Sequence, residues 1–595
     1  RPIQKMADDF GWGSRQQAEL TLDDLSINDS LTQVQRIERY VTSPIPLQRL
    51  VHVKLFSSTA VTEGIDVTRS VLLPLLGVLT ADDKIIVRQQ LPEQIVLIAE
   101  FLSTQGEEGY LIFVESLLPC LARLLHDHRE EVRQAASEAF VRASKLVRFV
   151  DIGRHVLSVL LRLAHDDDQE SLRMTAVWLL NELAPCLGTD ISVHYLVPEM
   201  LSLAEDPEVR IRRQVVWNFK KIFKFLQGNY RLTNCFLALT KDESFRVRKA
   251  CTEVIPDLST SLPIDKRGDI LLKVYMRLLQ DAHKRVRGGA LENLALFMVT
   301  LDPSQISTQL VGEFVSMSED AELKKQCAFY FPAVLFSIGP SRWPEVRDGY
   351  LTLAQSRVLL IKRTLAHSFH EVAKMLGSDI VEEDLLSVFE GFIQDSDETV
   401  SFAVLNHFAQ VLACVSPSWR QSYLYLLKEV LEQGGPMNWR LRESVASQLK
   451  GLAPLLEPKA CESAVVATTL ILMKDKVASV RTKALTAVSA ILQCLESEDE
   501  FKDPFVANML GLADGTVQDC QSFAVICGEI IQADIKDESL VSSFIARLTL
   551  LASSASPSPV RVAITMYIRQ NPWTQTNQHM SGVIQALQQD TLIKS

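Results

Sequence analysis

The sequence has no long apolar run, no paired cysteines and no excess of positive charge, and each absence excludes a class of protein. Its longest apolar windows, such as Val465–Met473, are far shorter than the roughly 18 to 20 residues that span a bilayer, so we expect no membrane segment. The first residues contain no charged and then apolar leader, so nothing supports a signal peptide. A net charge of -12 has the wrong sign for neutralising phosphates, so we expect no nucleic-acid partner.

The ten cysteines stand singly, without a Cys-x-x-Cys pair. This usage is typical of reduced thiols and predicts a cytoplasmic protein, with the nucleus as the alternative.

Motifs for catalysis are also missing. No glycine pattern suits a phosphate group, and no nucleophile stands beside a base in any familiar arrangement. The run Asp166–Asp168 lacks the Gly and the bidentate Glu of a calcium loop. His367 and His370 have a spacing that could chelate a metal, but one of them would have to leave the core-facing side of its helix, and no third ligand is evident. We therefore predict no catalytic residue, no metal, no cofactor and no enzymatic activity.

What the sequence does contain is a repeat: an Asp, four residues, then an aliphatic residue and an Arg. Six copies follow one another from Asp82 to Arg287, and more degenerate copies extend the series in both directions. The predicted copies start at residues 42, 82, 127, 167, 206, 242, 281, 320, 356, 395, 436, 475, 514 and 555. About fourteen units of roughly 39 residues result.

Each unit carries two stretches of helical periodicity, one on either side of the Asp. The third unit shows both stretches, with apolar residues at Leu117, Leu118, Leu121, Leu124 and Leu125, and then at Val132, Ala135, Ala136 and Phe140. A pair of amphipathic helices cannot bury its apolar face alone, so neighbouring pairs must stack. No strand alternation recurs with the same period, which disfavours a β-propeller. The predicted fold is all-α: an α-solenoid of about fourteen HEAT-type helical hairpins.

The Asp and the Arg of the motif have separate expected roles. The Asp can accept a hydrogen bond from the N–H groups that open the second helix. The Arg can reach the Asp of an adjoining unit, and the result would be a ladder of ion pairs. If these pairs are exposed, each contributes only about 0–1 kcal/mol, and the ladder would set the register between units.

The chain divides into predicted segments at points where the repeat weakens. Residues 1–20 read as a mobile tail, 21–315 as N-terminal repeats and 327–595 as C-terminal repeats. The segment 316–326 reads as a seam, because after Asp320 the slot for an aliphatic residue holds Lys325. The stretch Ser553–Pro559 reads as a loop, and the last eight residues as a frayed end.

A solenoid without a catalytic site is usually a binding surface, and its turns form a ridge that partners can grip. Trp439 is the most informative turn residue, because a Trp beside an Arg in a turn after the flexible stretch Gly434–Met437 suits an interface anchor. The alternative is a ring folded back onto the neighbouring unit, while Trp178 and Trp217 are expected in the core. The predicted partner-binding residues are Asn438, Trp439, Arg440, Lys474 and Lys476, and a second contact ridge comprises Arg246, His283, Lys284 and Arg285.

These units resemble the HEAT repeats of the scaffold subunit of protein phosphatase 2A, in which Trp-Arg-x-Arg is a familiar turn variant matched by Trp439–Arg442. The second half is more similar to the family of regulatory subunit 1 of protein phosphatase 4, through Gln326–Val334, Lys362–Glu371 and Asn438–Arg442. Members of that family carry an acidic insertion between two sets of repeats. Here the chain runs straight on near Ser318, so either this relative lacks the insertion or that stretch is missing from the sequence.

The resemblance implies a non-catalytic subunit that binds a Ser/Thr protein phosphatase catalytic subunit and directs it to substrates. It places that subunit on turns of the C-terminal units, at Trp439, Arg440, Lys474 and Lys476, and assigns all metal ions to the partner. Substrates or further regulatory proteins would be additional partners. A HEAT-repeat adaptor in a large assembly and a nuclear transport receptor remain alternatives. The substrate, the type of phosphatase (4 or 2A), the curvature and the oligomeric state are left open.

Overall fold

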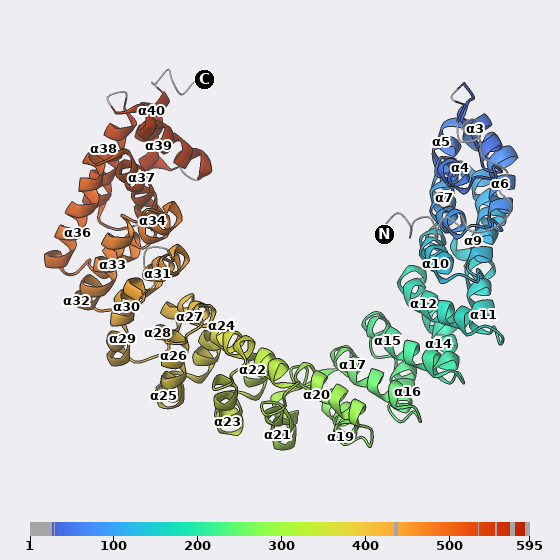
Figure 1. Cartoon of the computed structure of the whole chain (residues 1–595), viewed down its shortest axis with the longest axis horizontal. Coiled ribbons are helices and arrows are strands. Elements are labelled where there is room, and N and C mark those ends of the chain that lie inside the picture. Colours follow the sequence, from blue (N-terminus) through green and yellow to red (C-terminus); the bar gives the residue numbers. More distant parts are fainter. Residues whose placement is uncertain are drawn as a thin grey trace. The chain divides into compact units, whose positions relative to one another are not determined.

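The computed structural model describes residues 27–28, 30–433, 438–533, 535–553, 556–571 and 577–588, and within these ranges every regular element is a helix. Figure 1 shows the helices in chain order. The predicted all-α class is therefore confirmed. None of the described helices combines the length and the apolar character that crossing a bilayer requires.

The chain forms two compact units, residues 1–302 and 303–595. In unit 1 the α-helices are α3 (Gln33–Tyr40), α4 (Pro46–Val53), α5 (Phe56–Val67), α6 (Leu73–Leu79), α7 (Ile85–Ser103), α8 (Gly106–Ile112), α9 (Leu118–Leu124), α10 (Glu130–Ser144), α11 (Ser158–Ala164), α12 (Glu170–Leu187), α13 (Thr189–Ile191), α14 (Val197–Ala204), α15 (Val209–Phe225), α16 (Tyr230–Leu239), α17 (Phe245–Ser261), α18 (Ile264–Arg267), α19 (Lys273–Leu279) and α20 (Lys284–Met298).

In unit 2 they are α21 (Thr308–Ser316), α22 (Lys324–Ile338), α23 (Trp343–Ala354), α24 (Leu359–Leu376), α25 (Ser378–Ile380), α26 (Leu386–Ile393), α27 (Glu398–Leu405), α28 (Phe408–Ala413), α29 (Pro417–Tyr423), α30 (Tyr425–Gln433), α31 (Trp439–Leu452), α32 (Pro458–Ala460), α33 (Ala467–Leu472), α34 (Ala478–Leu485), α35 (Val488–Cys494), α36 (Asp499–Gly511), α37 (Val517–Gln532), α38 (Glu538–Ala552), α39 (Ser558–Gln570) and α40 (Ser581–Gln588).

In each unit these helices pair into successive hairpins, and the hairpins stack in two layers. The second helices pack on one another, as α12, α15 and α17 do in unit 1 and α22, α24 and α27 do in unit 2. The first helices form the other layer, as α14 and α16 do in unit 1 and α21 and α23 do in unit 2. This arrangement is the predicted solenoid of helical hairpins.

The apolar positions inferred from periodicity fill the space between the layers. All nine residues named for the third unit are buried except Ala135, which is half-buried. Trp178 and Trp217 are only half-buried, so the prediction that they belong to the core is wrong. Trp217 instead donates a hydrogen bond from Nε1 to the Glu253 carboxylate at 2.9 Å, and Arg213 lies over its ring. An indole N–H needs a polar partner, which explains its place at the edge of the layer.

Many first helices contain a single π-helical turn at an equivalent position. In unit 1 these turns are η1 (Thr68–Leu72), η2 (Phe113–Leu117), η4 (Gly153–Leu157), η5 (Ser192–Leu196) and η6 (Gly268–Leu272), and in unit 2 they are η9 (Val381–Leu385) and η11 (Cys461–Val466). Three of them precede a proline that has no N–H to donate, at Pro74, Pro119 and Pro198. Because the turn recurs from hairpin to hairpin, we assign it to the repeat architecture.

Two repeat registers read from the sequence need correction. In the first copy Arg49 makes the contacts of the motif cation, donating to the Ser43 carbonyl, so the copy starts at Ser43 rather than Thr42. In the eighth, Gly339 and Gly377 end α22 and α24 with φ of 82° and 81°. Aligning these glycines starts the eighth copy at Ser318, 38 residues before Ser356.

The corrected eighth register explains the apparent weakness of this copy. Leu323, rather than Lys325, occupies the aliphatic slot, and Lys324 follows it in the slot for a cation. Lys325 is exposed, as its corrected position on the outer face of α22 requires. The domain boundaries predicted from the sequence, including the seam at 316–326, stay predictions. The predicted tail at 1–20, the stretch Gly434–Met437, residues 554–555 of the predicted loop and residues 589–595 lie outside the described residues.

Candidate partner-binding turns

The turns between the two helices of a hairpin are joined by a ladder of ion pairs. In seven hairpins the cation of the motif reaches the Asp of the next hairpin, at 2.5–2.8 Å between the closest atoms. These pairs are Arg49 with Asp82, Arg88 with Asp127, Arg173 with Asp206, Arg212 with Asp242, Arg248 with Asp281, Lys362 with Asp395, and Arg442 with Asp475. The predicted ladder is confirmed at these positions.

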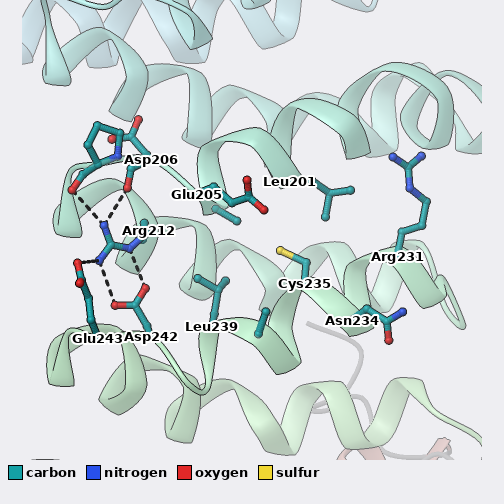
Figure 2. Close-up of a pocket in the computed structure, with 13 residues that line it drawn as sticks. Leu201, Glu205, Asp206, Arg212, Arg231, Asn234, Cys235, Leu239, Asp242 and Glu243 are labelled. Carbon is teal, nitrogen blue, oxygen red and sulfur yellow. Dashed lines mark hydrogen bonds and ion pairs between the residues drawn. The ribbon is translucent and has the colours of Figure 1, made fainter.

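Figure 2 shows one step of this ladder in detail. Arg212 donates to both carboxylate oxygens of Asp242, at 2.7 and 3.0 Å, and through its third nitrogen to the backbone carbonyl of Asp206 at 2.8 Å. One guanidinium thus holds its own turn closed and ties it to the next turn. The planar fork of Arg suits this double role, since it supplies several N–H donors in fixed directions.

The Asp of each pair also stabilises the turn in which it lies. Each of the seven carboxylates accepts a hydrogen bond from the N–H two residues further on, as Asp281 does from His283 at 2.8 Å. That residue precedes the helix, so the Asp forms an Asx turn ahead of the helix and does not cap the first helical N–H groups. The expected acceptor role is confirmed and its position corrected.

The ladder is more buried than the sequence analysis assumed. The seven Asp side chains are no more than 10% exposed, so the small energy of an exposed pair does not apply. Removing one partner of a buried pair leaves an uncompensated charge and typically costs about 3–5 kcal/mol. The Arg248 guanidinium and the His283 N–H hold the pKa of the Asp281 carboxyl below its ordinary value against the opposing effect of burial. The stability that this pair provides is therefore present above about pH 4 and lost as the pH falls through the lowered pKa.

A groove beside this step of the ladder has no catalytic character. It lies between α14 and α16, has a volume of about 820 Å³, and contains Cys235. Burial, followed by the charge of Glu205, raises the pKa of the Cys235 thiol to about 12. The thiol therefore remains protonated near neutral pH and is a poor nucleophile.

The predicted second ridge does assemble, and an aromatic residue holds it together. The His283 ring stacks on Phe245 with centroids 3.7 Å apart and planes at 4°. The Arg246 and Arg285 guanidinium groups lie 5.6 and 6.0 Å from the Phe245 centroid, and Lys284 is exposed beside them. His283 also accepts the N–H of Arg285 through Nδ1 at 3.2 Å. The sequence analysis missed Phe245, although an aromatic residue directly before Arg246 in a turn was a usable signal.

The predicted main site lies at the start of α31. Arg440 is exposed and its guanidinium carbon lies 4.9 Å from the centroid of the Trp439 ring, which is half-buried. Trp439 thus lies between the two alternatives considered, with part of the ring packed and part available. Asn438 is engaged within the chain: its Oδ1 accepts the N–H of Leu441 at 3.2 Å, and its Nδ2 donates to the Glu398 carboxylate at 3.3 Å.

The turn of the next hairpin adds two cations. Lys474 and Lys476 are exposed, and neither forms an ion pair with any residue that the structure describes. The pair of Arg442 with Asp475, 2.5 Å apart, joins this turn to the one that carries Trp439. The site therefore combines one aromatic ring and three exposed cations on two neighbouring turns. This composition suits an acidic protein surface.

The histidine pair considered as a metal site is arranged differently. His370 stacks on His407, 3.7 Å between centroids, rather than facing a ligand set with His367. Within the described ranges no group of three or more His, Cys, Asp or Glu side chains could hold a metal ion.

Comparisons with known families agree with this architecture. Residues 327–430 match the family described as protein phosphatase 4 regulatory subunit 1 middle domain, and residues 117–147 match the HEAT repeat. Regulatory subunit 1 of serine/threonine-protein phosphatase 4 from Homo sapiens is 30% identical over 275 residues, which cover 44% of this chain and 28% of that protein. Regulatory subunit 4 of the same phosphatase from Mus musculus is 22% identical over 275 residues, 46% of this chain and 30% of that protein. The resemblance inferred from the sequence is confirmed, and the relatives bear the names of regulatory rather than catalytic subunits.

Solved structures of transport receptors share the fold. Kap95p in its complex with RanGDP aligns with a TM-score of 0.60 at 14% identity and covers 91% of this chain and 75% of that one. Importin beta aligns with a TM-score of 0.59 at 13% identity and covers 93% and 77%. At such identities the likeness supports the α-solenoid fold and nothing about the ligand.

Proposed function

We propose that this homologue of protein phosphatase 4 regulatory subunits binds a Ser/Thr protein phosphatase catalytic subunit of the protein phosphatase 4 type and directs it to substrates. The chain matches only 28% of the length of the human relative, so the activity of the whole relative is part of the proposal. The observation that carries it is the exposed Arg440 guanidinium over the half-buried Trp439 ring, in a turn that follows the family-matched segment.

The chemistry of this turn supports its use as an anchor. An aromatic ring with a cation over its face offers a large contact area and charged donors on one element. Lys474 and Lys476 extend the cationic surface to the next turn, and they would steer an acidic partner toward the ring. The second ridge around Phe245 would contact a substrate or a further regulatory protein.

The test is a binding measurement with purified proteins. We expect Trp439→Ala combined with Arg440→Glu to weaken binding of the catalytic subunit by about tenfold or more, because truncating an interface anchor of this kind typically costs over 1 kcal/mol. Helicity by circular dichroism should stay unchanged, since Arg440 is exposed and Trp439 is only half-buried. Parallel titrations with catalytic subunits of the 4 and 2A types would decide which type binds.

A matched control is available in the same hairpin. Trp419 on α29 is 40% exposed, and Lys428 on α30 is also exposed. Both lie on the first helices, away from the turn before α31. Trp419→Ala with Lys428→Glu removes the same kinds of side chain and should bind normally. Equal binding by wild type and the Trp439 variant would count against the turn, and no binding by wild type would count against the function.

The cellular location is proposed as the cytoplasm, with the nucleus as the alternative. Subcellular fractionation of the full-length protein would distinguish the two compartments.

A further inference from the structure

Two phenylalanines stand out on α22 because water surrounds most of each side chain. Phe329 is 67% exposed and Phe336 is 78% exposed. They are seven residues apart, so they lie on the same side of the helix, about 10 Å from one another along its axis. Lys325 precedes Phe329 by one turn and is also exposed. The outer face of α22 therefore presents a column of one cation and two aromatic rings.

The neighbouring helix α24 continues this surface with a different chemistry. The two helices pack side by side, and the glycines that end them align residue i of α22 with residue i+38 of α24. This alignment places Arg363 beside Lys325, His367 beside Phe329 and Lys374 beside Phe336. Arg363, His367 and Lys374 are all exposed. An apolar column on α22 thus runs alongside a column on α24 that carries the cations Arg363 and Lys374.

The charge of this surface is opposite to that of the whole chain. The helices α22 and α24 together contain five Lys and Arg side chains and one carboxylate, Glu371, whereas the chain has a net charge of -12. One of the five, Lys362, is paired with Asp395 in the ladder, and the exposed cations Lys325, Arg363 and Lys374 form no ion pair with a described residue. Glu371 is also exposed, so three cations and one carboxylate accompany the two exposed rings, and this excess of positive charge suits an acidic partner.

We propose that the outer face of α22 and α24 binds an acidic amphipathic helix of a partner protein. The apolar side of that helix would cover Phe329 and Phe336, whose seven-residue spacing matches two turns of a helix lying along them. Its acidic edge would face Arg363 and Lys374. This surface is on the helices rather than on the Trp439 turn, so the proposal is independent of phosphatase binding.

The experiment uses the purified chain and a synthetic helical peptide of 18 residues. The peptide has Leu at the a and d positions of its heptads and Glu at the e and g positions, and a matched peptide has Lys in place of Glu. Calorimetric titration should detect binding of the acidic peptide that is about tenfold or more tighter than that of the basic one. Raising the salt concentration from about 50 to about 200 mM should weaken the binding of the acidic peptide, since the charged groups are exposed and salt screens them.

Two variants separate the apolar and basic contributions. Phe329→Ser with Phe336→Ser should reduce binding of the acidic peptide by about tenfold or more. Lys325→Glu with Arg363→Glu and Lys374→Glu should abolish the preference for the acidic peptide. As a control, Phe149→Ser with Val150→Ser removes two side chains in unit 1 that are 74% and 84% exposed, and binding should be unchanged. All these positions are exposed, so the melting temperature should not change.

The outcomes that overturn the proposal are specific. If wild type and the Phe329 and Phe336 variant bind the acidic peptide with equal affinity, this surface is not the binding site. Equal affinity for the acidic and basic peptides would refute the inference that the partner helix is acidic. Sedimentation velocity without peptide tests the other occupant: a dimer that is lost in the Phe329 and Phe336 variant would mean that a second copy of the chain covers this face.

Discussion

The ladder of ion pairs is more regular in unit 1 than in unit 2. Unit 1 contains five of the seven pairs, all formed by Arg, and their Arg side chains are 6–17% exposed. Unit 2 contains two pairs in this register, and one of them uses Lys362, which is 30% exposed and makes a single contact of 2.7 Å. Further along unit 2 the pairing changes: Lys502 reaches Asp537, and Arg547 reaches back to Asp514.

The difference indicates that the hairpins of unit 1 stack through one repeated contact, whereas those of unit 2 do not all use it. Unit 1 repeats one bidentate contact, which fixes the register of each hairpin on the next. Unit 2 keeps this bidentate contact between Arg442 and Asp475 but uses Lys362 with Asp395, and its second helices are interrupted between α27 and α28 and between α34 and α35. The Trp439 turn and the face of α22 and α24 are both in unit 2. The ladder is kept beside both surfaces, through Arg442 with Asp475 at the Trp439 turn and through Lys362 with Asp395 on α24.

The largest expected effect breaks the ladder in unit 1. Arg212→Met leaves the Asp242 carboxylate, 8% exposed, without its guanidinium, and it also frees the Asp206 carbonyl. We expect a loss of about 3–5 kcal/mol in the stability of the surrounding hairpins. Lys362→Met in unit 2 should cost less, because Lys362 is 30% exposed and makes one contact, so water can partly replace it beside the buried Asp395 carboxylate. Hydrogen exchange measured by mass spectrometry would report both changes locally, as faster exchange in α15 and α17 or in α24 and α27.

Two further variants control this comparison. Arg210→Ala removes a side chain that is 76% exposed and 3.9 Å from Glu170, and exchange should not change. Arg212→Met combined with Asp242→Asn removes both charges and keeps an acceptor for the Ser244 N–H, and it should recover part of the lost stability. If the Arg212 and Lys362 variants lose equal stability, the proposed difference between the units is refuted.

Sequence periodicity was enough to predict the fold because the motif and the core positions are set by local physics. The Asp, the aliphatic residue and the cation occupy fixed places in the regular turns, so the ladder and the stacked hairpins of the described residues followed from spacing. The errors arose where a degenerate copy offered two registers. Asp320 looked like the motif Asp and does accept the Glu322 N–H at 2.8 Å, but the Gly that ends α22 aligns the helix with a copy that starts at Ser318, and only the backbone shows that Gly339 has a positive φ.

The residues of the candidate site could be predicted from the sequence, but their contacts within the chain could not. The sequence identified Arg246 and His283 as neighbours on a ridge, yet the Phe245 ring between them was missed, because stacking depends on side-chain directions in two hairpins. Asn438 was predicted as a site residue because it precedes Trp439 and Arg440. Its hydrogen bond with Glu398, which is 40 residues away in sequence, was not predicted. Burial of the ladder was also missed, since charged residues in a turn are ordinarily exposed.

A smaller effect tests a feature that both units share. Gly188 in unit 1 and Gly339 in unit 2 each end a second helix with φ of 86° and 82° and ψ of 170° and 160°, a region open almost only to glycine. We expect Gly188→Ala and Gly339→Ala each to cost about 1–3 kcal/mol, in contrast to the unequal ladder variants. Gly312→Ala is the control, because Gly312 lies inside α21 with nothing near the added methyl group, and it should stabilise by about 0.5–1 kcal/mol. Thermal unfolding of the full chain measures all three, and a loss confined to one unit would contradict the shared role.

The smallest expected effect belongs to unit 2 alone. Burial, then the charge of His407, lowers the pKa of His370, and burial with His407 and Arg363 lowers the pKa of His367. A lowered histidine pKa means that the folded state prefers the neutral ring, so stability falls as the pH drops from about 6.5 toward the folded pKa. We expect the melting temperature of wild type to fall by about one or two degrees over this range, and His370→Phe, which keeps a ring stacked on His407, to fall by less. If His370→Phe keeps the full pH dependence, the histidine stack is not its source, and the titrating group must be sought elsewhere in the chain.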